Sequence, residues 1–157
     1  MKGIFSVLVE NQAGVLSQIS GLFARRGFNI DSLAVGETEN HDVSSMTIVS
    51  TGDERTIDQI EKQLNKKLDV IKVRRLENNN CVCREMMLIK VSCTPANRSS
   101  LLEICLISHA EIVHMGPKDM IIEMQAAPDE IENFIELVRS FGIKEIQRTG
   151  TVALKKD

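Results

Sequence analysis

Residues 10–16 read ENQAGVL, and they join a run typical of a strand to a run typical of a helix. The first amides of a helix have no partner within it and lie at the positive end of its dipole. Such a turn can therefore bind an anion such as a carboxylate. Gly14 has no Cβ to keep a ligand away from the backbone. Asn11 carries both an amide donor and an acceptor, so it can cap the helix or contact a zwitterion.

Asn29, at the start of the next expected strand, offers a second polar contact, and an apolar wall would come from Ile30, Val15 and Leu16. These groups suit a small apolar amino acid. Helix amides would take its carboxylate, amide oxygens its ammonium group, and aliphatic side chains its tail. The alternative is an ordinary strand–helix turn with an Asn cap and a glycine.

The elements that would position this turn follow from the spacing of apolar residues. The first 75 or so residues predict the order β-α-β-β-α-β, the split βαβ or ferredoxin-like arrangement. The predicted strands cover residues 2–10, 29–38, 43–50 and 70–75. The first helix is marked by Val15, Leu16, Ile19, Leu22 and Phe23 and ends at Gly27; the second starts near Asp53 or Glu54 and is marked by Ile57, Ile60, Leu64 and Leu68.

The second half of the chain repeats this order. Its predicted strands cover residues 85–92, 111–115, 120–125 and 143–148. Pro128 can occupy the first position of the last helix, and Gly142 ends that helix. The helices are marked by Leu101, Leu102, Cys105 and Leu106, and by Ile131, Phe134, Ile135, Val138 and Phe141.

The fold class predicted is therefore α+β, with two ferredoxin-like βαββαβ domains. We expect an N-terminal domain over residues 1–76, a polar linker over 77–83 and a C-terminal domain over 84–157. A domain of about 75 residues buries only about 60% of its unfolded surface, so each alone would be marginally stable. Self-association, most commonly a twofold dimer, is the expected remedy.

Composition excludes several classes of function. The chain has 157 residues, of which 43% are hydrophobic, 26% charged and 3% aromatic, and its formal net charge is −3. A chain with no basic excess and few aromatic rings is not suited to general nucleic-acid binding. No apolar run approaches the length of a membrane span, and the strand pattern that begins at once leaves no room for a secretory signal. We expect a cytoplasmic protein, whose four cysteines stay reduced.

Other chemistry is weakly supported. Cys81 and Cys83, with Cys93 and Cys105 elsewhere, do not have the usual C-x₂₋₄-C spacing of a metal ligand pair, so no metal site is predicted. The HAE at 109–111 lacks the P-C-x-x-C of zinc deaminases, and His114 alone on a strand is not evidence for a base or ligand. No nucleotide-binding, zinc-protease or nucleophile-elbow motif occurs. A self-contained enzyme is not expected.

Four stretches of the sequence resemble a known family and span nearly the whole chain: VLVENQAGVLSQISGLFARRGFNIDSLAVG, MTIVSTGDERTIDQIEKQLNKKLDVIKV, REMMLIKV and RSFGIKEIQRTGTVAL. They resemble the small subunit of acetohydroxyacid synthase, also called acetolactate synthase, whose N-terminal part is an ACT domain. The combination of LFARRGFNI with the terminal RTGTVAL is more specific than the N-x-x-G-V-L that many ACT domains carry.

The resemblance implies a non-catalytic regulatory subunit in branched-chain amino-acid biosynthesis. It would activate a separate catalytic subunit, which holds thiamine diphosphate, FAD and Mg²⁺, and this chain would carry no cofactor. It would make that enzyme sensitive to feedback by valine, or sometimes by leucine or isoleucine. ACT domains pair, so we expect a homodimer in which the effector bridges facing helix N-termini. By the motif, the effector site is lined by Asn11, Gln12, Ala13, Gly14, Val15, Leu16, Asn29 and Ile30.

The second half departs from the family pattern in two places. Ile107 and His114 stand where a Phe and an Asp are expected, and Ala126-Ala127 stand where a Thr-Gly is expected. An alternative function also stays open, namely a freestanding ACT-type amino-acid sensor that acts on another protein. Such a sensor would share the N-terminal pocket but would need neither RTGTVAL nor the second domain.

Overall fold

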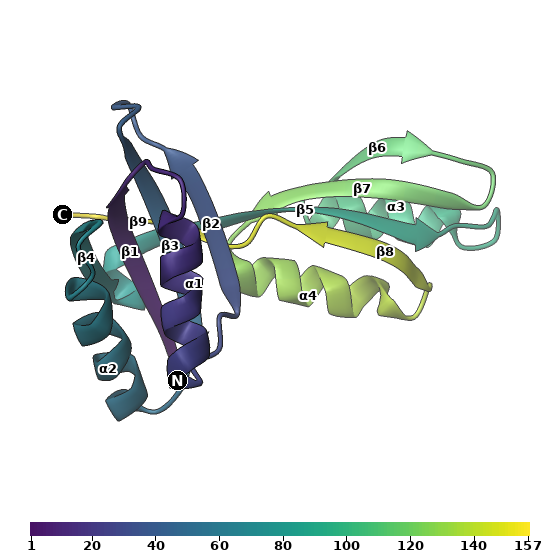
Figure 1. The fold of residues 1–157 in the computed structure, drawn as a ribbon. Coiled ribbons are helices and arrows are strands. Elements are labelled where there is room, and N and C mark those ends of the chain that lie inside the picture. Colours follow the sequence, from purple (N-terminus) through teal and green to yellow (C-terminus); the bar gives the residue numbers. More distant parts are fainter. The chain divides into compact units, whose positions relative to one another are not determined.

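The computed structural model describes every residue from Met1 to Asp157, and these residues form two compact units. The N-terminal unit comprises Met1–Cys83 together with Thr151–Asp157, and the C-terminal unit comprises Arg84–Gly150. The N-terminal unit holds β1 (Lys2–Glu10), α1 (Val15–Arg26), β2 (Ser32–Glu37), β3 (Val43–Thr51), α2 (Glu54–Asn65), β4 (Val70–Leu76), the short 3₁₀ helix η1 (Asn78–Asn80) and β9 (Val152–Lys155) (Figure 1).

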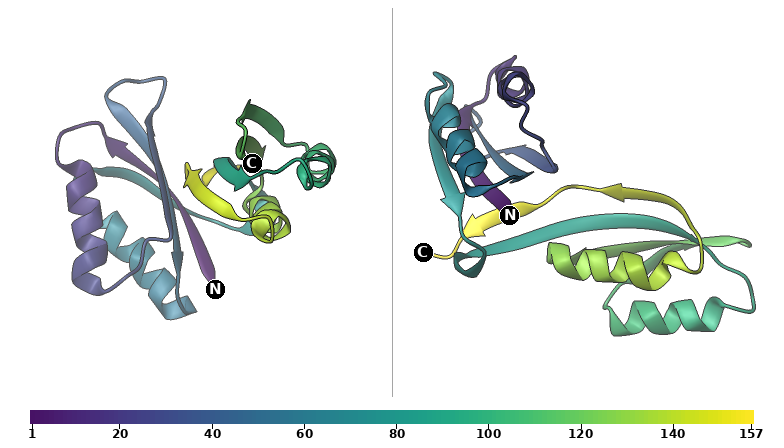
Figure 2. Two further views of the ribbon diagram at one scale, coloured as in Figure 1. Left: turned by 90° about the vertical axis from the view of Figure 1, so that its right-hand side faces the viewer. Right: turned by 90° about the horizontal axis from the view of Figure 1, so that it is seen from below.

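The N-terminal sheet is antiparallel, with strand order β2-β3-β1-β4, and α1 and α2 cover one of its faces (Figures 1 and 2). Alternation along β1 turns Phe5, Val7 and Val9 toward the helices, where each is almost fully buried. The helices contribute residues at helical spacing, which form the core of the unit with them: Val15, Ile19, Leu22, Phe23, Ile57, Ile60 and Leu64.

The opposite face of this sheet is partly covered by later parts of the chain. Ile4, Val49 and Leu76 form a second small cluster there with Cys81, which lies at the start of β5 (Cys81–Ser92). β9 pairs with β5 in the same region, and Ala153 packs against the cluster (Figure 2). Residues from both ends of the second half therefore complete the N-terminal unit.

The C-terminal unit repeats the topology. After β5 it holds α3 (Arg98–Ile107), β6 (Glu111–Met115), β7 (Asp119–Ala126), α4 (Pro128–Arg139) and β8 (Ile143–Arg148). The strand order is β6-β7-β5-β8, with α3 and α4 on one face (Figure 1). Met87, Ile89 and Val91 of β5 are fully buried beneath the helices, in a cluster with Phe134 and Val138 of α4.

The structure confirms the predicted α+β class with two βαββαβ units, but its divisions differ from the predicted domain bounds. The expected linker 77–83 contains η1 and the first residues of β5, and Thr151–Asp157 group with the N-terminal unit rather than with residues 84–150. The second helix ends at Asn65, so Leu68 lies beyond it and is 96% exposed. No helix is long and apolar enough to span a membrane.

Candidate functional site

The entry to α1 has the geometry expected of an anion site. Gly14 is the N-cap, with φ 89° and ψ −10°, a left-handed conformation that favours glycine. No side chain caps the helix, and the first regular bond is donated by the Gln18 N–H to the Gly14 carbonyl at 3.0 Å. The amides of Leu16 and Ser17 precede that bond, so they have no partner within the helix and lie at the positive end of its dipole.

Space is available at the same turn. A Cβ built on Gly14 would meet no atom within 4 Å, and Gln12, Ala13 and Leu16 are all exposed. Val15, in contrast, is only 4% exposed and belongs to the core beneath the sheet. Of the two apolar residues predicted to line this end, Leu16 is therefore exposed to a ligand, whereas Val15 packs in the core and anchors the helix.

Asn11 does not cap the helix. Its Nδ2 donates to Glu37 Oε1 at 3.2 Å and to the His41 carbonyl at 2.7 Å, while its backbone N–H donates to the Asp42 carbonyl at 2.8 Å. These bonds tie the β1–α1 turn to the hairpin between β2 and β3. The amide donors of Asn11 are thus used within the chain, whereas its Oδ1 remains an acceptor for an external donor.

Glu37 and His41 were not among the predicted site residues, although the structure places them beside Asn11. Glu37 Oε2 lies 2.8 Å from His41 Nδ1, and both side chains are more than half exposed. The sheet order carries the signal that locates them: Glu10 pairs with Val43 and Glu37 pairs with Ser44. The ends of β1 and β2 therefore lie at the same end of the sheet, on either side of the start of β3, but the strand order cannot be read from local spacing.

Asn29 and Ile30 lie at the other end of the sheet. Asn29 Nδ2 donates to Asp31 Oδ1, its carbonyl accepts from Ser50 Oγ, and the Asp31 N–H donates to the Val49 carbonyl. Asn11 is bonded to Asp42 just before the start of β3, whereas Asn29 is bonded to Ser50 near its end. These two points are about eight residues apart along the strand, which at about 3.3 Å per residue is about 26 Å. Within one chain, the predicted site residues therefore fall into two separate groups, Asn11–Leu16 and Asn29–Ile30.

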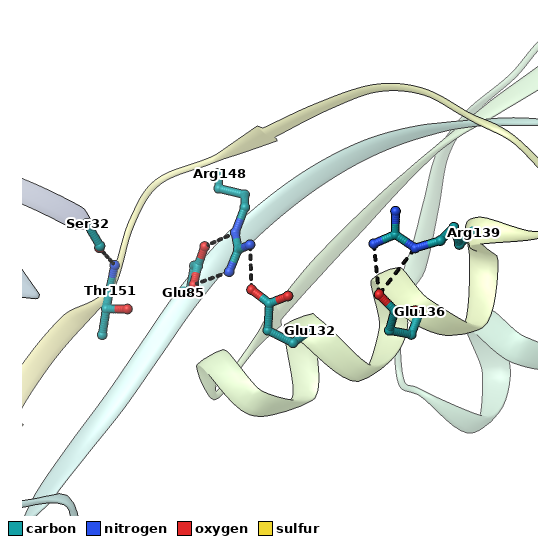
Figure 3. A network of polar contacts seen from close by, with 7 residues as sticks. All are labelled: Ser32, Glu85, Glu132, Glu136, Arg139, Arg148 and Thr151. Atoms are coloured by element: carbon teal, nitrogen blue, oxygen red, sulfur yellow. Dashed lines mark hydrogen bonds and ion pairs between the residues drawn. The ribbon is translucent and has the colours of Figure 1, made fainter. Parts of the chain in front are cut away.

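The C-terminal unit holds a different polar cluster (Figure 3). The buried Glu85 receives Arg148 Nε and Nη2 in a bidentate pair, and Arg148 Nη1 also donates to Glu132 Oε1 at 2.7 Å. The pKa of Arg148 is raised above its ordinary value, mainly by the hydrogen bond to Glu85. This cluster joins β5, α4 and β8 of the unit and has no nucleophile or base poised for chemistry.

A cavity of about 430 Å³ also lies in this unit, lined by the end of α3, the end of β7 and one side of α4 from Glu130 to Leu137. It includes two of the positions that depart from the family pattern, Ile107 and Ala126. Ile107 is 79% exposed and the neighbouring Leu106 78%, so the end of α3 is apolar toward solvent as well as toward the core.

Comparisons with known proteins agree along the whole chain. The family model described as the AHAS small subunit-like ACT domain matches residues 5–72, and the model described as the small subunit of acetolactate synthase matches residues 84–157. The probable acetolactate synthase small subunit of Archaeoglobus fulgidus is 47% identical over 154 residues, which cover 98% of this chain and 96% of that protein. The acetolactate synthase small subunit of Mycolicibacterium smegmatis is 42% identical over 151 residues, 96% of this chain and 89% of that protein.

A solved structure gives the same result. The crystal structure of the acetolactate synthase small subunit from Thermotoga maritima matches with a TM-score of 0.89 and 39% identity, covering 99% of this chain and 97% of that chain. Because relatives of this identity align over nearly the full length of the chain, the chain belongs to the family of acetolactate synthase small subunits.

Proposed function

We propose that this chain is the non-catalytic regulatory subunit of an acetolactate synthase, which activates a separate large catalytic subunit and confers feedback inhibition by a branched-chain amino acid, valine first. The observation that carries the proposal is the uncapped N-terminus of α1 at Gly14, beside the available Oδ1 of Asn11. Thiamine diphosphate, FAD and Mg²⁺ would be held by the large subunit. We expect both subunits to work in the cytoplasm.

Each part of the effector has a matching group at this turn. The carboxylate would accept hydrogen bonds from the amides of Leu16 and Ser17, where the helix dipole favours negative charge. The ammonium group would donate to Asn11 Oδ1 and lie near the Glu37 carboxylate, which is already within 3.2 Å of the Asn11 amide. The aliphatic side chain would lie against Leu16, which is 46% exposed in one protomer.

A dimer through β2 would complete the site. β2 is an edge strand, with β3 as its only sheet neighbour, and it leaves a row of unpaired backbone groups. If β2 pairs antiparallel with β2 of a second copy, the start of one strand meets the end of the other. The partner's Asn29 would then approach Glu37 and Asn11. In this arrangement the two α1 N-termini would not face each other, unlike in the dimer expected from the sequence. Each N-terminus would instead lie beside the partner's Asn29.

The match of residues 84–157 to the small-subunit family supports a large-subunit partner rather than a freestanding sensor. Coupling between an effector site and an enzyme is typically about 1–3 kcal/mol and must be reciprocal. The large subunit should therefore change the affinity of this chain for valine by about 5- to 150-fold.

The test compares two substitutions of equal size at one position. Gly14→Asp would place a carboxylate against that of the effector, whereas Gly14→Asn has nearly the same shape without the charge. Both fit the open space at Gly14, and Asn and Asp are the residues that best tolerate its left-handed backbone. Juxtaposed like charges cost several kcal/mol, and about 1.4 kcal/mol is a tenfold change in affinity.

Calorimetry with valine on the purified chain, and acetolactate formation after addition of the large subunit, give separate readouts of binding and regulation. We expect Gly14→Asp to weaken valine binding by more than about tenfold with activation largely kept, and Gly14→Asn to weaken it less. If Gly14→Asp abolished activation while inhibition by valine stayed intact, the effector site would have to lie elsewhere.

A further inference from the structure

Two cysteines near the junction of the two units lie in contact. Cys81 and Cys83 are the first and third residues of β5, so their side chains project from the same side of the strand. The two Sγ atoms are 3.6 Å apart. Cys81 is 6% exposed, within the cluster of Ile4, Val49 and Leu76, whereas Cys83 at its margin is partly exposed.

We propose that Cys81 and Cys83 form a reactive dithiol that small-molecule disulfides, such as oxidised glutathione, convert to an intramolecular disulfide. The partly exposed Cys83, as the thiolate, would attack one sulfur of the small disulfide, which forms a mixed disulfide and releases one thiol. Cys81 would then attack the Cys83 sulfur and release the second thiol. The two cysteines lose two hydrogens and two electrons, and the small disulfide gains them as two thiols.

The strand geometry determines how stable the bond would be. Residues two apart in an extended strand have Cα atoms separated by about 6.6 Å, whereas disulfides usually span about 5.5–6 Å and rarely exceed about 6.8 Å. Cys81 is fully extended, with φ −142° and ψ 159°. The strand spacing is thus at the upper end of the range that disulfides span, so closing the bond would strain β5, a strand that also pairs with β9. Strain of this kind makes a disulfide easier to reduce, so the modification would be reversible.

The position gives the bond a structural consequence. β5 is the strand by which the chain passes from the N-terminal unit to the C-terminal unit, between Cys83 and Arg84. A bend at Cys81–Cys83 would disturb the pairing of β5 with β9 and the backbone bond from the Lys156 N–H to the Asn80 carbonyl, 3.0 Å long in the reduced chain. The inference does not depend on the proposed effector site.

The experiment equilibrates the full-length chain in buffers with increasing ratios of oxidised to reduced glutathione, quenches with acid, and measures intact mass and thiols. We expect the chain to lose the mass of two hydrogens, the thiol count to fall from the four of the reduced chain to two, and peptide mapping to place the bond within residues 81–83. Reduced glutathione should restore all four. Retention of four thiols in the most oxidising buffer, or a stable mixed disulfide on the unsubstituted chain, would overturn the proposal.

Variants assign the steps. Cys81→Ala, which lacks the resolving thiol, should accumulate a mixed disulfide at Cys83. The double variant Cys93→Ala/Cys105→Ala serves as the matched control and should oxidise like the unsubstituted chain. Both of its positions are buried, and burial raises the pKa of the Cys105 thiol. Consumption of Cys93 or Cys105 before Cys83 would contradict the assignment.

Discussion

At the residue scale, Arg148 donates to two carboxylates that differ in their access to water. The side chain of Glu85 is 3% exposed and that of Glu132 is 56% exposed. Removing one member of a buried pair leaves an uncompensated charge, which costs about 3–5 kcal/mol, while an exposed pair contributes about 0–1 kcal/mol. The two halves of this cluster should therefore respond very differently to substitution.

We expect Arg148→Met to destabilise the C-terminal unit by about 3 kcal/mol, because it strands the buried Glu85 carboxylate. Glu132→Gln is the matched control, with an expected change within about 1 kcal/mol. The chain has no Trp or Tyr, so urea unfolding is best followed by circular dichroism, with hydrogen exchange over residues 84–150 to locate the effect. Equal losses for the two variants would contradict the burial argument.

A second residue-scale prediction concerns the start of α2. Asp53 Oδ1 accepts from the Thr56 N–H at 2.7 Å. Hydrogen bonding to Thr56, first with its side chain and then with this backbone N–H, holds the pKa of Asp53 below its ordinary 3.8. A carboxyl whose pKa is lower in the folded chain stabilises the fold above its unfolded pKa. That contribution is lost as the pH falls through the folded value.

Asp53→Ala should accordingly lower the thermal midpoint at pH 7, and its difference from the unsubstituted chain should shrink as the pH falls below 3.8. Asp53→Asn keeps an oxygen that can cap the helix but cannot titrate in this range, so it should retain most of the stability at pH 7. Melting curves by circular dichroism from pH 7 into the acid range check both. A pH-independent difference for Asp53→Ala would mean that the cap acts without its charge.

At the element scale, the sequence predicts elements well wherever the pattern is local. The strands at Lys2–Glu10, Glu111–Met115 and Ile143–Arg148 have their predicted bounds, and Pro128 occupies the first turn of α4 as expected. These segments have clear alternation or an unambiguous start signal, and their own side chains decide their conformation.

Elements that depend on distant partners were missed. β9 is four residues long, and its residues are fixed by bonds such as that from the Ala153 N–H to Thr47 Oγ1, a residue 106 positions earlier. Cys81–Cys83, predicted as part of a linker, belong to β5, and this strand likewise pairs with a distant segment, β9. Leu68 continues the helical spacing of α2, although the helix ends at Asn65. Periodicity alone carries no stop signal, so the sequence could not locate this end.

The candidate site likewise has a part that depends on local sequence and a part that depends on distant partners. The Gly14 turn is local and could be predicted from glycine, helix start and strand end, whereas the contacts of Asn11 with Glu37 and His41 depend on the sheet order β2-β3-β1. The separation of Asn29 from Asn11 depends on the length of β3 in between. Sequence spacing cannot show that these two residues lie at opposite ends of the same sheet.

The proposed pairing of β2 edges leads to a prediction for that element. Val35 in the middle of β2 is 46% exposed, and a twofold contact would bring it against the partner's β2. Val35→Lys should place two positive charges together across the axis and dissociate the dimer. Analytical ultracentrifugation measures the change. Leu68→Lys, at a fully exposed position outside any strand, is the control and should leave the assembly unchanged. A dimer unaffected by Val35→Lys would place the contact elsewhere.

At the scale of the whole molecule, the chain leaves the N-terminal unit along β5 and returns to it after Gly150. On its return, the Thr151 N–H donates to Ser32 Oγ of β2 at 2.8 Å (Figure 3), and Thr151 is 5% exposed. The last residues are thus a structural part of the unit that carries the proposed effector site. In particular, Thr151 is bonded to the edge strand through which we expect two copies to pair.

Deleting residues 151–157 should consequently destabilise the N-terminal unit, although the deletion lies at the opposite end of the sequence. Ser32, Thr47 and Asn80 would lose the bonds that they accept from the backbone N–H groups of the deleted Thr151, Ala153 and Lys156. At about 1 kcal/mol each, these three bonds alone amount to about 3 kcal/mol, and the pairing of β9 with β5 is lost in addition. Hydrogen exchange should become faster at the start of β5 and on the sheet face of Ile4 and Val49, which β9 helps to cover. Leu154→Ser keeps the backbone of β9 and changes only a side chain that is 76% exposed, so it should leave this protection intact. If the deletion affected only residues 84–150, these terminal residues would belong energetically to the C-terminal unit instead.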